Sequence, residues 1–175
     1  RVLFRSEIYK KLIFWELEME KSESNEMQEI LSDQKSEANR IFSKFISKEY
    51  LNWANPTVSN APLTSPKLFE NKILPHIDKT VPVIWLVIDN LRFDQWKAIQ
   101  PIFQENFRVL EEDSFYSILP TATQYSRNAV FAGLMPAEIE KQTPHLWKND
   151  EEEGGKNLHE EELFQLQLKR LNRED

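Results

Sequence analysis

Prolines gather in one stretch of the chain, and this cluster limits the fold more than any other feature. Five of the nine prolines lie there, at Pro56, Pro62, Pro66, Pro75 and Pro82. Proline lacks an amide hydrogen and fixes φ, so this stretch cannot be regular helix throughout. Apolar residues follow a helical spacing before it and form a short continuous run after it. We therefore expect residues 55–80 to link a helical segment, residues 1–54, to a domain of different architecture, residues 81–175.

The segment before the linker has the pattern of two helices. Apolar residues recur every three or four positions from Phe4 to Met19, which predicts an amphipathic helix. Asn25 and Gln28 have the spacing of a capping box that begins a second helix. Two helices joined by a short polar turn predict an antiparallel hairpin, which is typical of a packing scaffold or a dimerisation element. The stripes expected to face one another are Phe4, Ile8, Leu12 and Trp15 on the first helix and Ile30, Ile41 and Phe45 on the second.

A continuous apolar run, VPVIWLVI at residues 81–88, follows the linker. Continuous rather than alternating hydrophobicity is typical of a strand that is covered on both faces, as in a parallel sheet. We expect this run to be the central strand of a mostly parallel sheet, with Asp89 at its carboxyl end. The order of the later patterns predicts an α/β sandwich. The later elements that the patterns predict are a helix over 91–103, strands over 107–110 and 115–119, a helix from Thr123 that Gly133 ends, and a last helix over 158–172 after an acidic loop.

Composition excludes several classes of protein. The net charge of −7 argues against a surface that coats nucleic acid, although it leaves room for a nucleotide pocket. The absence of cysteine excludes disulfide scaffolds and cysteine-ligated metal sites. No apolar run approaches the roughly 20 residues that a membrane span needs, and the first residues do not have the pattern of a secretion signal. We therefore expect a cytoplasmic protein with no membrane partner.

Asp89 is the first candidate for a functional role. Ligands of α/β sheets bind at the carboxyl ends of strands, where loops converge on a rigid support. A carboxylate at that point is a natural ligand for zinc, magnesium or manganese. The alternative is that Asp89 caps the helix expected from residue 91.

The second candidate is the segment LPTATQYSRN, residues 119–128. It places a hydroxyl at the N-terminus of a helix, where backbone amides and the helix dipole favour a bound phosphate. A threonine hydroxyl becomes a useful nucleophile when a metal or a base lowers its pKa, and Asp89 is placed to help hold such a metal. The alternative is that Thr123 only caps the helix.

Two longer motifs carry a family resemblance. VIWLVIDNLRFDQW and SILPTATQYSRNAVFAGLMP, residues 83–96 and 117–136, together resemble the PglZ branch of the alkaline phosphatase superfamily. The arrangement of the whole chain is most similar to PorX-type response regulators, which control type IX secretion. In that family a receiver domain precedes a helical segment and a PglZ domain. The resemblance implies that this chain is a central piece, with a helical bundle followed by the first half of an alkaline-phosphatase-like α/β sandwich.

The resemblance implies roles for individual residues. Asp89 matches the first metal-ligand aspartate of the superfamily, and Thr123 matches the nucleophile, which also contacts the metal. Thr121 remains a rival for the nucleophile. The residues implied to bind the phosphoryl group are Ser126, Arg127 and Asn128. Two zinc ions are implied for a complete site, with the remaining ligands outside this chain, because the three histidines do not match the later ligand motifs. These are His76, His145 and His159.

The function that the resemblance implies is that of a two-component response regulator. Its effector domain would be a zinc-dependent phosphodiesterase acting on nucleotide or oligonucleotide diesters through a phosphothreonine intermediate at Thr123. The partners implied are a cognate sensor kinase, an extracytoplasmic-function sigma factor and, in a homodimer, a second copy of the chain. The piece alone is expected to be inactive. The alternative is a non-catalytic signalling module that binds a nucleotide or a sigma factor through the phosphatase-like fold.

Overall fold

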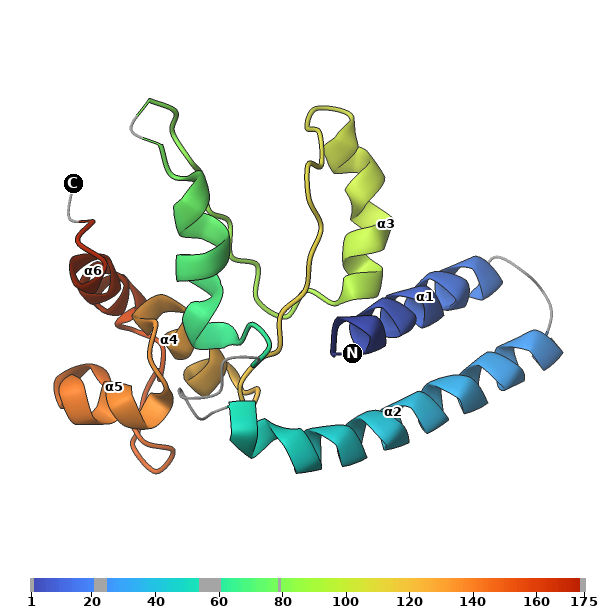
Figure 1. The fold of residues 1–175 in the computed structure, drawn as a ribbon, viewed down its shortest axis with the longest axis horizontal. Coiled ribbons are helices and arrows are strands. Elements are labelled where there is room, and N and C mark those ends of the chain that lie inside the picture. The colour runs from blue at the N-terminus through green and yellow to red at the C-terminus, as the bar shows by residue number, and fades with distance from the viewer. Residues whose placement is uncertain (1, 21–24, 54–60, 79, 174–175) are drawn as a thin grey trace. The chain divides into compact units, whose positions relative to one another are not determined.

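The computed structural model describes residues 2–20, 25–53, 61–78 and 80–173. In these ranges the regular structure is almost all helical (Figure 1). The chain forms two compact units, one from residues 1–62 and 90–114 and the other from residues 63–89 and 115–175. None of the described helices is long and apolar enough to cross a membrane.

The described residues of the first unit form the helices α1 (Val2–Glu20), α2 (Asn25–Trp53) and α3 (Phe93–Gln104). α1 packs against both α2 and α3. The predicted helical hairpin and the helix predicted over 91–103 are therefore confirmed. The side chain of Asn25, expected as a cap, lies outside the described residues. Gln28 instead reaches across to α1, where its Nε2 donates to the Met19 carbonyl over 3.5 Å.

The stripes predicted to face one another in the hairpin are wrong. Ile13, which is not in the predicted stripe, is the buried residue among the described side chains of α1, with 5% of its surface exposed. α1 carries apolar residues on all sides, such as Phe14 next to Ile13, so spacing alone does not select the face that packs. The Phe4 side chain lies outside the described residues. The predicted stripe residues that are exposed are Ile8, Trp15, Ile30 and Ile41.

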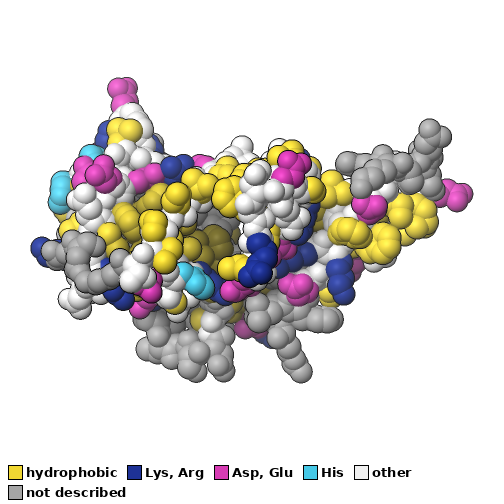
Figure 2. All heavy atoms as spheres, turned by 90° about the horizontal axis from the view of Figure 1, so that it is seen from above, with side chains coloured by type: hydrophobic (Ala, Val, Ile, Leu, Met, Phe, Trp, Pro, Cys, Tyr) yellow, Lys and Arg dark blue, Asp and Glu magenta, His cyan; other side chains and the backbone are white. Residues whose placement is uncertain are grey.

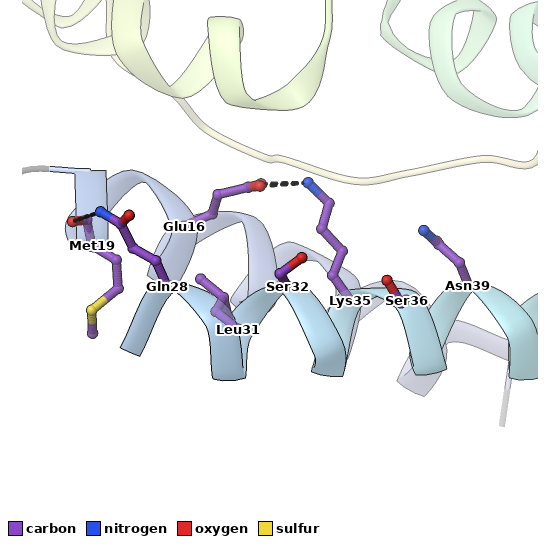
Figure 3. A pocket seen from close by; sticks show the side chains of 8 residues that line it. All are labelled: Glu16, Met19, Gln28, Leu31, Ser32, Lys35, Ser36 and Asn39. Atoms are coloured by element: carbon purple, nitrogen blue, oxygen red, sulfur yellow. Dashed lines mark hydrogen bonds and ion pairs between the residues drawn. The ribbon is translucent and has the colours of Figure 1, made fainter. Parts of the chain in front are cut away.

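Part of the contact between α1 and α2 is polar. The Nζ of Lys35 donates to both carboxylate oxygens of Glu16, at 2.7 and 2.6 Å. This ion pair lies in a pocket between the two helices, to which Gln28, Ser32 and Asn39 also contribute side chains (Figure 3). Partly exposed ion pairs stabilise a fold weakly, by roughly 0–1 kcal/mol. Among the described side chains of α1 and α2, Ile13 is the apolar one that is buried.

The strands predicted after the linker are wrong for the described chain. Residues 81–88 and 107–110 have no strand, and the described residues contain only isolated bridges, Thr64 to Tyr116 and Asp78 to Val81. A strand needs a neighbour whose backbone groups pair with its own. Apart from the single bridge at Val81, no such neighbour pairs with the 81–88 run, so no sandwich forms within the described residues. Hydrophobic side chains therefore remain on the surface (Figure 2), with Ile84 83% exposed.

The second unit is built around α4 (Thr123–Ala132), α5 (Pro136–Gln142) and α6 (Glu160–Arg170). α4 packs against both α5 and α6. Gly133 ends α4 with a φ of 63°, as predicted from its position. The buried core of these helices consists of Ala132, Ile139, Leu146, Trp147 and Leu163.

An aromatic cluster extends this core. Trp85 lies in the middle of the predicted strand. The centroid of its ring is 5.4 Å from that of Phe69 and 5.5 Å from those of Phe131 and Phe164. Phe69 is almost fully buried. The apolar run is therefore anchored to the helical unit through Trp85, although its neighbours point outward.

Residues 55–60 and 79 of the predicted linker lie outside the described residues. Farther along, the chain forms three short helical turns, η1 (Ser65–Lys67), η2 (Phe69–Ile73) and η3 (Leu74–His76), and a similar turn, η4 (Pro144–Leu146), follows α5. Pro66 and Pro75 stand in the first turns of η1 and η3. A proline is tolerated there because the first amides of a helix have no partner within it.

Candidate functional site

Thr123 is the first helical residue of α4, and Ala122 occupies the N-cap position before it. The interpretation of Thr123 as a helix cap is therefore wrong. Its side chain is exposed, and its hydroxyl makes no hydrogen bond to any residue that the structure describes. The first amides of a helix lack partners within it, and the helix dipole is positive at that end. The hydroxyl of Thr123 thus lies where an anionic group is favoured.

Thr121 and Ser126 lie beside Thr123 at the start of α4. Thr121 is exposed and precedes the N-cap residue. Its carbonyl accepts a hydrogen bond from the Ser126 hydroxyl at 3.1 Å, and the same hydroxyl lies 3.2 Å from the Ala122 carbonyl. Ser126 therefore uses its one hydroxyl proton to fasten the first turn of the helix.

Asp89 follows the apolar run and contacts α4. Its Oδ2 lies 3.3 Å from Nη1 of Arg127, and 44% of its side chain is exposed. The next helix, α3, begins at Phe93 with Arg92 in the N-cap position, so Asp89 does not cap it. Arg127 is four residues after Thr123, and residues at this spacing share one face of a helix. The ion pair therefore brings Asp89 to the face of α4 that bears Thr123.

Glu160 is the second carboxylate on Arg127. Its Oε2 accepts a hydrogen bond from Nη2 at 2.7 Å, and its Oε1 lies 2.6 Å from Nε. The Glu160 side chain is 18% exposed. Burial acts to lower the pKa of Arg127, but the contacts with Glu160 and Asp89 outweigh it and leave this pKa raised. The sequence did not single out Glu160, because it begins a run of three glutamates, 160–162, of similar appearance.

Asn128 is buried, with 2% of its surface exposed. Its Nδ2 donates to the Lys156 carbonyl at 3.0 Å, and its Oδ1 accepts from Nδ2 of Asn157 at 3.1 Å. Asn157 also donates to the Thr123 carbonyl at 3.2 Å. The Asn128 side chain therefore holds the acidic loop against α4, and both of its polar atoms are engaged there.

The acidic loop, residues 149–157, is also attached to the first turn of α4. The Asp150 carboxylate accepts hydrogen bonds from Nε2 of Gln124 and, at 2.7 Å, from the Tyr125 hydroxyl. The hydrogen bond to Asp150 raises the pKa of Tyr125, with smaller contributions from burial and from the charge of Asp150. The loop therefore lies over the residues that follow Thr123.

The described residues do not form a metal centre among themselves. The part of the chain that the structure describes contains no group of three or more histidine, aspartate or glutamate side chains that could hold a metal ion. His159 instead places its Nδ1 3.4 Å from Glu162. Asp89 and Thr123 are two candidate ligands, and Asp89 already contacts a guanidinium. A zinc site with two ions does not fit the described residues alone.

Two family models match the chain. Residues 68–172 match the BREX system PglZ alkaline phosphatase-like domain, and residues 5–54 match the PorX response regulator linker domain. The first match covers the apolar run, α4 and α6, and so includes every residue of the candidate site. The second covers the helical hairpin. No curated protein matches the chain.

Proposed function

The chain belongs to the PglZ alkaline phosphatase-like domain family and carries a PorX-type response regulator linker before that domain, and from this we propose that it is the part of a response regulator whose effector hydrolyses phosphate esters. Response regulators use an effector domain to turn a signal into an output, and a phosphatase-like domain makes that output a chemical reaction. The proposal concerns the protein that carries this sequence as a whole.

The observation that carries the proposal is the exposed hydroxyl of Thr123 at the N-terminus of α4. Arg127 stands one turn later on the same face of the helix, with its guanidinium held between two carboxylates. A hydroxyl, the positive end of a helix dipole and a guanidinium on one face suit a phosphoryl group, which carries negative charge on its oxygens.

The reaction proposed is a two-step displacement. The Oγ1 of Thr123 attacks phosphorus, the bond from phosphorus to the leaving oxygen breaks, and the leaving alcohol takes up the proton that the threonine hydroxyl releases. A water molecule then attacks the phosphoryl–threonine ester and frees the hydroxyl. Arg127 would offset charge on the phosphoryl oxygens. Ser126 and Asn128 have a smaller part in this proposal, because their polar atoms are engaged with the backbone, Asn157 and the acidic loop.

Zinc belongs to the proposal only through the two positions that the superfamily resemblance assigns, Asp89 and Thr123. The described residues supply no third ligand beside them. The remaining ligands of the two ions would come from other parts of the protein. No step above depends on the metal.

The finer features proposed for the whole protein also come from the resemblance. These are nucleotide or oligonucleotide diesters as substrates, an α/β sandwich for the complete PglZ domain, control of type IX secretion, and a cytoplasmic location. The proposed partners are a sensor kinase, an extracytoplasmic-function sigma factor and a second copy of the chain.

A second candidate function is favoured by one contact. The Arg127 guanidinium lies against the Asp89 carboxylate, which is the proposed metal ligand. A guanidinium that permanently takes the place of a cation would make the domain a non-catalytic module that binds a nucleotide or a sigma factor. The two candidates differ in whether Thr123 is needed for turnover.

The experiment compares Thr123→Val with Thr121→Val in the whole protein supplied with zinc. Hydrolysis of bis(p-nitrophenyl) phosphate is the readout. We expect Thr123→Val to lose at least about a hundredfold in kcat, as removal of a nucleophile does. Thr121→Val should stay within about threefold of wild type, because its side chain lies before the N-cap residue. Loss of hydrolysis in Thr121→Val alone would identify Thr121, and not Thr123, as the nucleophile. Inactive wild type, or activity that needs neither hydroxyl, would support the non-catalytic module.

A further inference from the structure

The guanidinium of Arg127 has two edges in different surroundings. Its Nε and Nη2 edge faces the Glu160 carboxylate at 2.6 and 2.7 Å. Nε and the facing Oε1 are shielded from solvent, and their contact is an ion pair outside hydrogen-bond geometry. The hydrogen bond from Nη2 joins two charged groups, and such bonds are shorter and stronger than those between neutral groups.

The Nη1 side of the same guanidinium is held less closely. It lies 3.3 Å from Oδ2 of Asp89, which is more than twice as exposed as Glu160, at 44% against 18%. The contact with Asp89 is thus longer and more exposed to solvent than the contact with Glu160. An incoming anion could replace it without disturbing the Glu160 side.

The aromatic ring of Phe131 limits the remaining freedom of the guanidinium. The Cζ of Arg127 lies 5.9 Å from the centroid of this ring, one turn farther along α4. A guanidinium over the face of a ring within about 6 Å is attracted to it, which favours this position of the Arg127 side chain. Glu160 and Phe131 together leave Nη1 as the group that can exchange partners.

We propose that Glu160 is a positioning residue, which holds the Nε and Nη2 edge of Arg127 so that Nη1 can leave Asp89 and donate to a phosphoryl oxygen at the start of α4. This inference rests on the proposed function of the site. Glu160 touches no substrate itself. Its effect passes through Arg127, so it should change the binding of the anion more than the bond-breaking step.

The chain offers a matched control in Glu161. It lies next to Glu160 in the first turn of α6, and it contacts Gln165 of its own helix at 3.3 Å rather than Arg127. Replacing either glutamate by glutamine removes the same charge from the same helix end, so the loss of favourable interaction with the helix dipole is similar. A difference between the two variants therefore reports on the contact with Arg127.

The experiment uses the whole protein with inorganic phosphate as the binding probe and bis(p-nitrophenyl) phosphate as the substrate. We expect Glu160→Gln to weaken phosphate binding about tenfold and to raise KM by a similar factor, as for the loss of one charged hydrogen bond. The kcat should stay within about threefold, and Glu161→Gln should match wild type in all three quantities. Glu160→Asp keeps the charge, and it should recover most of the affinity.

A double-mutant cycle separates positioning from a general effect on folding. Adding Glu160→Gln to Arg127→Met should cause no further loss of phosphate affinity, because the group that Glu160 positions is already gone. Equal phosphate affinity in Glu160→Gln and Glu161→Gln, additive losses in the cycle, or a wild type that binds no phosphate would each overturn the inference.

The failure of this inference is distinguishable from failure of the proposed function. If wild type and the glutamate variants bind phosphate with the expected affinities but the wild type hydrolyses nothing, the positioning role is supported and the proposed enzymatic function is wrong. If hydrolysis depends on Thr123 but Glu160→Gln and Glu161→Gln have the same phosphate affinity and KM, the enzymatic function is supported and the positioning role is wrong.

Discussion

Nη1 of Arg127 lies 3.3 Å from Oδ2 of Asp89, so an ion pair joins the end of the apolar run to the helix that begins at Thr123. The sequence predicted that Asp89 would reach the site from the end of a strand. In the described chain no strand places it there, and its contact with α4 is electrostatic. An exchangeable contact of this kind is compatible with a carboxylate that changes partners when a ligand arrives.

Trp85 and Leu86 are neighbours in the apolar run with opposite surroundings. Trp85 packs against three aromatic rings, whereas Leu86 is 70% exposed. We expect Trp85→Ala to lower the free energy of unfolding by about 3 kcal/mol, since it removes a large side chain from a packed cluster. Leu86→Ala should change it by less than about 0.5 kcal/mol. Urea unfolding measures both, and equal losses would indicate that the run is covered on both sides.

Gly133 ends α4 in a left-handed conformation, with a φ of 63°. A Cβ built there would lie 2.7 Å from Cδ of Gln167, which is buried and donates to the Val130 and Phe131 carbonyls at 3.0 and 2.7 Å. We expect Gly133→Ala to destabilise the fold by about 2 kcal/mol or more, from backbone strain and from displacement of this amide.

Gly155→Ala is the control for that change. The atoms nearest to a Cβ at this position belong to the exposed Leu158 side chain, the first of them at 2.9 Å, and such a side chain can move aside. Its cost should stay below about 1 kcal/mol. Thermal or urea unfolding of the two variants provides the comparison, and a Gly133→Ala protein as stable as Gly155→Ala would contradict the structure at the end of α4.

Glu112 predicts a pH dependence in the first unit. Burial acts to raise the pKa of its carboxyl, but hydrogen bonds from Lys97 at 2.7 Å and Trp96 at 3.2 Å outweigh burial and lower this pKa. A lowered pKa means that the carboxylate stabilises the fold above its unfolded-state pKa of 4.5 and loses that contribution as pH falls through the folded-state pKa. Glu112→Gln should therefore cost about 0.5–1 kcal/mol at pH 7, and less at about pH 3, because the cost shrinks as the carboxylate becomes protonated. Urea unfolding of wild type and Glu112→Gln at both pH values measures this cost. A cost that grows as the pH falls would contradict the prediction.

The helices were largely predictable because their signals are local. Periodic apolar spacing predicted α1, α2, α3 and α6, and Gly133 marked the end of α4 because a left-handed residue there favours glycine. The buried face of α1 was not predictable in the same way. Apolar residues surround that helix, so the choice of Ile13 over Ile8 depends on neighbours far along the chain.

The outcome for the predicted strands, and the part that Glu160 has in the site, depended on partners that local sequence does not reveal. A β-branched apolar run becomes a strand only where another strand pairs with it, and residues 81–88 have no such neighbour in the described chain. Asp89 and Arg127 were identified because they lie in recognisable motifs. Glu160 was missed because its importance comes from a contact over 33 residues, and nothing in its own segment distinguishes it from Glu161.

The central claim is that the Thr123 hydroxyl accepts the phosphoryl group, and trapping the covalent intermediate tests it most directly. The whole protein is mixed with a phosphodiester substrate and zinc, quenched in acid within the first turnover, digested and examined by mass spectrometry. The account predicts an adduct on Thr123, in the peptide that contains residues 119–127, in which the phosphoryl group still carries the substrate's remaining ester group, and no adduct in Thr123→Val. A phosphoryl ester on Thr121 or elsewhere, or turnover without any phosphorylated peptide in repeated early quenches, would contradict the account.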